Sequence, residues 1–232
     1  MLAHAHTGCD LIISTGMSTL LEIEEMLGVV AFGFMYPKNT QITSRSIFEE
    51  AYLSKEGQDL LQERVTLLHC TSEYPAPYED IDLNAMVAIR NAFGLKTGYS
   101  DHSEGISVAT AATALDAKII EKHFTLDKTL PGPDHKASLD PIELKDMITA
   151  IRNIEKAMGN GNKEPKSSEI ENKKITRKSL VAAVKINKGD LFTEYNLTTK
   201  RSEGGLSPML YWELLNTKSQ NSYKPDEFIC DQ

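Results

Sequence analysis

Two histidines, His102 and His123, each follow a short run of residues that is typical of a β-strand. The alanine-rich segment between the two runs, at 109–117, has helical spacing, so this stretch predicts a strand–helix–strand unit. A connection of this kind makes the two strands parallel neighbours, and both histidines then lie at the same end of the sheet. Three carboxylates are close in the sequence: Asp101, Glu121 and Asp134. Imidazoles converging beside carboxylates predict a divalent-metal site.

The structural alternative is that these histidines only pack in the interior. A single histidine at a strand end is more often structural than a metal ligand, but two at successive strand ends, each beside a carboxylate, favour metal binding. We expect His69 to be packed within the protein. His135 either reaches a substrate or closes a turn, and the sequence favours neither. We expect Cys70 to be a buried, unreactive thiol.

The elements that position these residues form a repeating pattern. Strands are predicted to end near Gly16, Cys70, His102 and His123, each followed by a helix. Successive βα units with polar residues at the strand ends are typical of a (β/α)8 barrel, whose active site lies at that face. A complete barrel needs about 250 residues. We therefore predict an α/β fold in which the second half of a TIM barrel precedes a small β-rich domain.

Capping signals place several helices. Thr19 with Glu22 predicts a helix over 20–27, and Asp140 with Glu143 predicts a second one that ends near Met158. A third helix is predicted over 84–93, with Gly94 as its stop. Residues 31–64 are interpreted as an insertion between barrel units, with one helix over 46–64.

Composition divides the chain and limits its function. We predict a barrel domain at 1–160, a linker at 161–172, where polar residues and glycines concentrate, and a β-rich domain at 173–232. A net charge of −8 argues against a nucleic-acid binder. No apolar run approaches the length of about 20 residues that a membrane-spanning helix needs. Three widely spaced cysteines do not form a disulfide framework, which favours the cytoplasm.

Five motifs, in order along the chain, resemble the N-acetylneuraminate (sialic acid) synthase family, which includes legionaminic acid synthases. They are STGMS at 14–18, HCTSEYPAP at 69–77, GYSDH at 98–102, EKHFT at 121–125 and GPDHKAS at 132–138. The segment 178–201 resembles the family's C-terminal antifreeze-like, or SAF, domain, a small β-clip-like fold. The resemblance implies condensation of phosphoenolpyruvate with an N-acyl amino-sugar aldehyde, such as N-acetylmannosamine or a related 6-deoxy sugar.

The resemblance also implies roles for individual residues. His102 and His123 match the ligands of a divalent metal, Mn²⁺ or Mg²⁺, and Glu121 matches a carboxylate beside that metal; these three are the implied catalytic residues. The implied binding residues are Ser14, Ser72 and Ser100 for the phosphate, and Tyr74, Asp134 and Arg201 for the sugar. Arg201 matches an arginine that enters the partner subunit's active site in a domain-swapped homodimer.

Two departures from the family pattern are visible. Ser202 and Glu203 follow Arg201 where relatives usually have Pro-Gly. The family's first strands carry a glutamate for acid–base chemistry and lysines for phosphoenolpyruvate, and the chain has no match to them, so we expect it not to turn over substrate alone. The alternatives are an inactive remnant that acts as a carbohydrate-binding or assembly protein, and a metal-dependent hydrolase, which Ser14 and Ser100 disfavour.

Overall fold

The computed structural model describes residues 1–38, 44–132, 134–201 and 204–230. The chain divides into two compact units, Met1–Gly161 and Asn162–Gln232, and each is described by itself. No helix among the described residues is long and apolar enough to cross a membrane.

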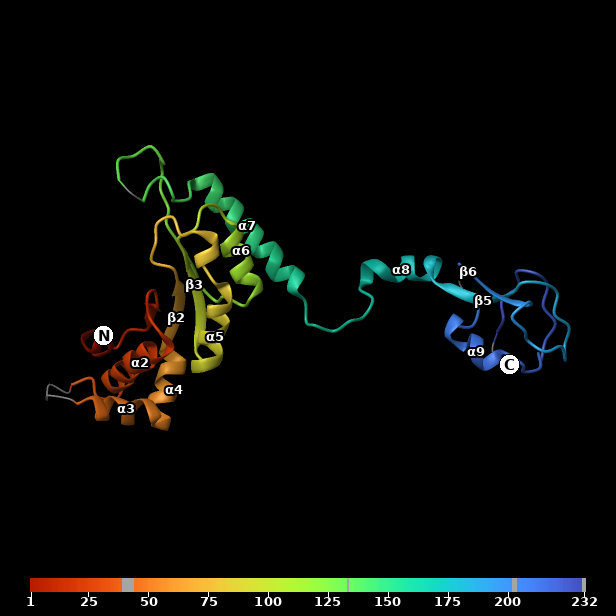
Figure 1. Cartoon of the computed structure of the whole chain (residues 1–232), viewed down its shortest axis with the longest axis horizontal. Coiled ribbons are helices and arrows are strands. Elements are labelled where there is room, and N and C mark those ends of the chain that lie inside the picture. Colours follow the sequence, from red (N-terminus) through yellow and green to blue (C-terminus); the bar gives the residue numbers. More distant parts are fainter. Residues whose placement is uncertain (39–43, 133, 202–203, 231–232) are drawn as a thin grey trace. The chain divides into compact units, whose positions relative to one another are not determined.

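The first unit is built on a four-stranded parallel sheet with the strand order β1-β2-β3-β4 (Figure 1). The strands are β1 (Leu11–Ser14), β2 (Val65–Cys70), β3 (Lys96–Asp101) and β4 (Ile120–Lys122). Their spatial order follows their order in the chain, with a helical connection between neighbours, as expected for consecutive units of a (β/α)8 barrel. The prediction of a parallel half-barrel sheet is confirmed.

Helices precede, connect and follow the strands of this sheet. They are α1 (Leu2–Ala5), α2 (Leu20–Met35), α3 (Arg45–Leu53), α4 (Lys55–Arg64), α5 (Leu83–Phe93), α6 (Ser107–Ala114) and α7 (Pro141–Met158), with a 3₁₀ turn at Tyr78–Asp80. The capping signals are confirmed at α2 and α7, where both arms of each capping box form. Gly94 ends α5 with a left-handed conformation, φ +64°, as predicted.

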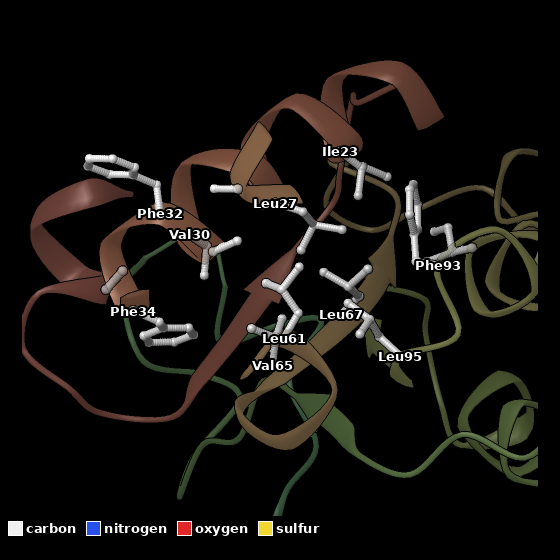
Figure 2. Packing of buried hydrophobic residues seen from close by; sticks show 14 residues of the cluster. Ile23, Leu27, Val30, Phe32, Phe34, Leu61, Val65, Leu67, Phe93 and Leu95 are labelled. Carbon is white, nitrogen blue, oxygen red and sulfur yellow. The ribbon is translucent and has the colours of Figure 1, made fainter. Parts of the chain in front are cut away.

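The principal core lies between the sheet and α2. Leu27 and Val30 of α2 are fully buried, and they face Val65 and Leu67 of β2 (Figure 2). Successive side chains of a strand point to opposite faces, so every second residue of each strand faces this core. The alternate residues face the other side of the sheet, and Ser14, Leu68 and Ser100 are among them.

Two sequence predictions about the segment 20–64 are wrong in detail. The first helix does not end at 27: α2 continues to Met35. Val30, Phe32 and Phe34 are buried in the core, and this burial outweighs the low helix propensity of the glycines in the helix. The predicted helix over 46–64 is two helices, because Ser54 is extended (ψ 146°) and caps α4 by accepting a hydrogen bond from the Gly57 amide.

The second unit contains a short antiparallel pair, β5 (Lys178–Ala182) and β6 (Leu197–Arg201). It also contains α8 (Ser167–Thr176), α9 (Tyr211–Leu214) and a 3₁₀ turn at Pro208–Leu210. A small separate core around Leu180, Ile186 and Phe192 holds it together. The segment 161–172, interpreted as a linker, includes the first six residues of α8. Glu169 caps that helix by accepting a 2.9 Å hydrogen bond from the Lys166 backbone amide.

Candidate active site

The polar residues at the ends of β3 and β4 sort onto two faces. Ser100 and Glu121 are register partners, and the next pair, Asp101 and Lys122, points to the opposite side of the sheet. His102 continues the alternation of Ser100 one step beyond β3. The two strand ends therefore present one set of side chains to the open face and another to the helix side.

Ser100 and Glu121 form the floor of the open face. The Ser100 hydroxyl donates a 2.6 Å hydrogen bond to Glu121 Oε1. Ser100 is only 2% exposed, whereas Glu121 is exposed. One carboxylate oxygen is thus fixed by the sheet, and Oε2 remains available to solvent or to a ligand.

His102 is held in one tautomer by the loop after β2. Its Nδ1 lies 2.7 Å from the carbonyl oxygen of Thr71, which can only accept, so Nδ1 carries the proton. In the neutral ring the lone pair is then on Nε2, 3.3 Å from Ser100 Oγ. Because the Ser100 proton is directed to Glu121, that lone pair is free to bind a ligand. A backbone carbonyl is one of the common partners of the non-ligating nitrogen in a metal-binding histidine.

Three rings gather above this floor. The ring centroids of His102 and His123 are 5.5 Å apart, and that of Tyr74 lies 4.2 Å from His102 and 5.5 Å from His123. Asp134 approaches from the loop after β4, with Oδ1 4.0 Å from His123 Nδ1. The convergence of the two histidines, predicted from the strand–helix–strand pattern, is confirmed, and Tyr74 and Asp134 lie beside them.

Ser14 and Ser72 belong to the other half of the same sheet edge. Ser14 ends β1 opposite Leu68, and it is exposed. The turn that follows runs directly against the loop after β2: a Cβ on Gly16 would overlap Ser72 Oγ and come within 2.9 Å of Cys70 Sγ. Glycine avoids both contacts at this position, and the close approach brings the predicted phosphate-contacting turn next to Ser72.

Three other residues with reactive side chains are hydrogen-bonded or buried within the protein. The Nε2 atom of His69 lies 2.7 Å from the carbonyl oxygen of Ile81, so His69 is packed, as predicted. His135 hydrogen-bonds Thr125 Oγ1 at 2.8 Å through Nδ1, within its own loop. Burial is the main cause that raises the pKa of the Cys70 thiol, with a smaller contribution from the charge of Glu121. This agrees with an unreactive thiol.

One part of the sequence interpretation is corrected. Asp101 does not join the histidines: its Oδ2 lies 2.9 Å from Lys122 Nζ on the helix side, with both side chains buried. Lys122 is a residue of this region for which the motifs indicated no role. The signal was present, since strand alternation places Lys122 opposite to Glu121 and His123, and places Asp101 opposite to Ser100 and His102.

The two imidazoles are suited to a divalent metal that keeps several open positions. Among the described residues, no group of three or more His, Cys, Asp and Glu side chains is arranged to enclose a metal. Two nitrogen donors, with the His102 lone pair free and the Glu121 carboxylate nearby, fit an ion that completes its coordination with water or substrate oxygens.

Arg201 lies in the second unit. It is the last residue of β6 and is exposed, and it has no ion pair among the described residues of the chain. The neighbouring Lys200 pairs with Asp226 at 2.5 Å. The departure noted at Ser202 and Glu203 lies outside the described residues.

Comparison with known proteins identifies the family of this chain. The model of the NeuB family matches residues 1–163. The chain belongs to the NeuB family. It is 49% identical to N,N′-diacetyllegionaminic acid synthase of Campylobacter jejuni, over 94% of this chain and 58% of the relative. It is 38% identical to human N-acetylneuraminate-9-phosphate synthase, over 71% of this chain and 46% of that protein. The NeuB chain thus spans about half the length of these relatives.

One solved structure agrees with this membership, and a second one shares the fold. The sialic acid synthetase of Leptospira borgpetersenii, determined in complex with citrate, is 32% identical with a TM-score of 0.53, covering 74% of this NeuB chain and 50% of the solved one. A putative spore coat polysaccharide biosynthesis protein E from Chromobacterium violaceum shares the fold, with a TM-score of 0.59 at 18% identity over 94% of this chain and 66% of that chain.

Proposed function

We propose that this chain provides the metal-binding half of a nonulosonic acid synthase site, in an enzyme that condenses phosphoenolpyruvate with an N-acyl amino-sugar aldehyde. The convergence of His102 and His123 above the Ser100–Glu121 hydrogen bond is the observation that carries the proposal. Both relatives described above are named for synthase activities. N-acetylmannosamine and its 6-deoxy relatives are the proposed acceptors.

In the proposed reaction, C3 of the enolpyruvate attacks the aldehyde carbon, water adds at C2, and phosphate leaves by C–O cleavage. His102 and His123 would hold Mn²⁺ or Mg²⁺, which supplies Lewis-acid activation of the aldehyde oxygen when bound. Glu121 uses Oε1 to accept from Ser100, so Oε2 is the atom proposed to take a proton from the water that adds at C2.

Hydroxyl groups at the sheet edge are proposed to bind the phosphate. Ser14, Ser72 and Ser100 come from three successive strand ends, and the contact between Gly16 and the Ser72 loop supports their action on one group. Hydroxyl donors at the carboxyl ends of parallel strands are suited to an anion. Ser14 and Ser72 are proposed to donate directly, whereas Ser100 would donate to the phosphate only by turning its proton away from Glu121. Tyr74 and Asp134, beside the two histidines, are the proposed sugar contacts.

For the second unit we propose an SAF domain whose Arg201 enters the active site of a second copy in a domain-swapped homodimer. The exposure of Arg201 at the end of β6 supports this proposal. An arginine can bind a carboxylate or a sugar oxygen with two parallel N–H donors. We also propose a cytoplasmic location, in keeping with three free cysteines.

Phosphate release tests the reaction. The 232-residue chain, and the same chain joined to the first four βα units of the C. jejuni relative, would be incubated with phosphoenolpyruvate, Mn²⁺ and each candidate aldose. We expect phosphate release from the joined protein and its loss in H102A and H123A, with H4A, an exposed histidine of α1, as the matched control. Aldose binding without phosphate release in a folded joined protein would favour the carbohydrate-binding alternative.

A further inference from the structure

A buried ion pair lies directly behind the two histidines. Lys122 Nζ and Asp101 Oδ2 are 2.9 Å apart, with side chains 3% and 0% exposed. Lys122 also donates to the carbonyl oxygen of Ser103. Asp101 Oδ1 accepts two hydrogen bonds from Ser103, at 2.9 Å from its amide and 2.6 Å from its hydroxyl. Among the described residues this is the only ion pair with both side chains buried.

Stability alone does not account for such a pair. Removing two charges from water costs several kcal/mol per ion, and well-packed apolar residues of similar volume often stabilise a core equally well. What the pair provides instead is a fixed geometry, because Asp101 uses both oxygens and Lys122 binds two different acceptors. Charge-assisted hydrogen bonds of this kind are short and directional.

The ion pair fixes the ends of β3 and β4 directly before the two histidines. Asp101 and Lys122 form the last register pair between β3 and β4, and His102 and His123 are the residues that directly follow the two strands. Ser103, the third member of the network, follows His102. The backbone of His102 is therefore held on both sides, by Asp101 before it and by Ser103 after it, and Lys122 joins both points to β4.

We propose that the Asp101–Lys122 pair is a positioning device that sets the separation and orientation of the His102 and His123 imidazoles for a divalent metal. Neither residue touches the metal or the substrate, because both point to the helix side of the sheet. The inference rests on the proposed metal site, but it makes a separate claim about the metal-free protein. In that state the pair keeps Nδ1 of His102 against the Thr71 carbonyl.

The first test uses the metal-free chain. Nitrogen-15 NMR of the imidazoles distinguishes the two histidine tautomers, and we expect His102 to show a protonated Nδ1 in the wild type. In K122M the buried carboxylate loses its partner, and we expect the His102 signals to move toward a mixture of tautomers. R90M is the matched control: Arg90 pairs with Asp116 at 3.5 Å, before β4 begins, away from the histidines. Unchanged His102 signals in folded K122M would overturn the inference.

The second test titrates Mn²⁺ into each variant by electron paramagnetic resonance. We expect K122M to bind Mn²⁺ about tenfold or more weakly than wild type, which is the usual loss when a residue supporting a metal ligand is removed, and R90M to bind as the wild type does. If the wild type binds no Mn²⁺ while the His102 signals of K122M still change, the proposed metal site fails and the positioning role stands.

A double variant, D101N/K122M, keeps the inference testable if K122M does not fold. It removes both charges together, so no ion is left buried alone, and we expect its thermal stability to recover toward wild type. The cross-strand link is still absent, so we expect altered His102 signals and weak Mn²⁺ binding to persist. Recovery of all three properties would show that the pair only balances charge, and would overturn the inference.

Discussion

Ser100 and Glu121 lie opposite each other on β3 and β4, joined by a 2.6 Å hydrogen bond from the serine hydroxyl to the carboxylate. The bond is a cross-strand link on the face that carries the histidines. The Asp101–Lys122 pair is a second link, one residue further along and on the other face. The two strand ends are therefore tied on both sides of the sheet just before the histidines.

Replacing Ser100 by alanine removes the first link. We expect S100A to lower the free energy of unfolding by about 1 kcal/mol, which is the usual contribution of one hydrogen bond. The loss stays this small because Glu121 is exposed, and water can replace the Ser100 hydroxyl as its donor. Urea denaturation followed by circular dichroism measures this change. T149A is the control: it deletes an exposed hydroxyl that bonds to Lys145 within α7, and surface changes of this kind stay within about 0.5 kcal/mol. Equal effects in the two variants would contradict the prediction.

Replacing Gly16 by alanine tests the contact between the first two strand-end loops. A methyl group there overlaps Ser72 Oγ, so we expect G16A to destabilise the protein by about 1–3 kcal/mol. The second variant, G16A/S72A, removes the overlap with the hydroxyl and leaves 3.6 Å between the two Cβ atoms, but the 2.9 Å approach to Cys70 Sγ remains. We therefore expect it to recover part of the loss in thermal denaturation. A double variant no more stable than G16A would show that the contact with Ser72 is not the cause.

Glu143 at the start of α7 should make stability depend on pH. Its hydrogen bond from Lys128 is the first cause that lowers the pKa of this carboxyl below its ordinary value of 4.5, and the Asp140 amide is the second. A lowered folded-state pKa stabilises the protein above the unfolded pKa, and this contribution disappears as the pH falls through the folded value. We expect E143Q to melt below wild type at pH 7, with the difference shrinking below about pH 4.5.

The control for this measurement is E155Q, on the same helix, which breaks an exposed ion pair with Arg152 at 2.9 Å. Exposed pairs contribute little, so its melting temperature should stay close to wild type at pH 7. A constant difference between E143Q and wild type from pH 7 to pH 3 would contradict the assignment of the stabilisation to the ionised Glu143.

Cys70 should be the slowest of the three thiols to react. Burial is the main cause that raises its pKa, so the thiolate fraction at neutral pH is small, and the side chain is only 7% exposed. Cys9 and Cys230 are exposed. We expect iodoacetamide at pH 7.5 to label these two in the native protein and Cys70 only after denaturant is added, as followed by mass spectrometry of tryptic peptides. Native labelling of Cys70 at the same rate would contradict this.

The sequence by itself determined the sheet topology and the meeting of His102 with His123. A short helical crossover makes neighbouring strands parallel, so residues that follow two such strands must share one edge. Local signals were also enough for the start of α7, where Asp140 and Glu143 satisfy the free amides of the first turn within four residues. These features depend on residues that are close in the chain.

Only the tertiary structure decided which side chains become partners. Strand alternation puts Asp101 and Lys122 on the face away from the histidines, but their pairing depends on the register of β3 and β4. The position of the ring of Tyr74 against His102 likewise depends on where the loop after β2 lies. The length of α2 was set by the burial of its second half against other elements rather than by the helix propensity of its residues. In each case the deciding energy comes from partners distant in the chain, and periodicity along one segment does not encode it.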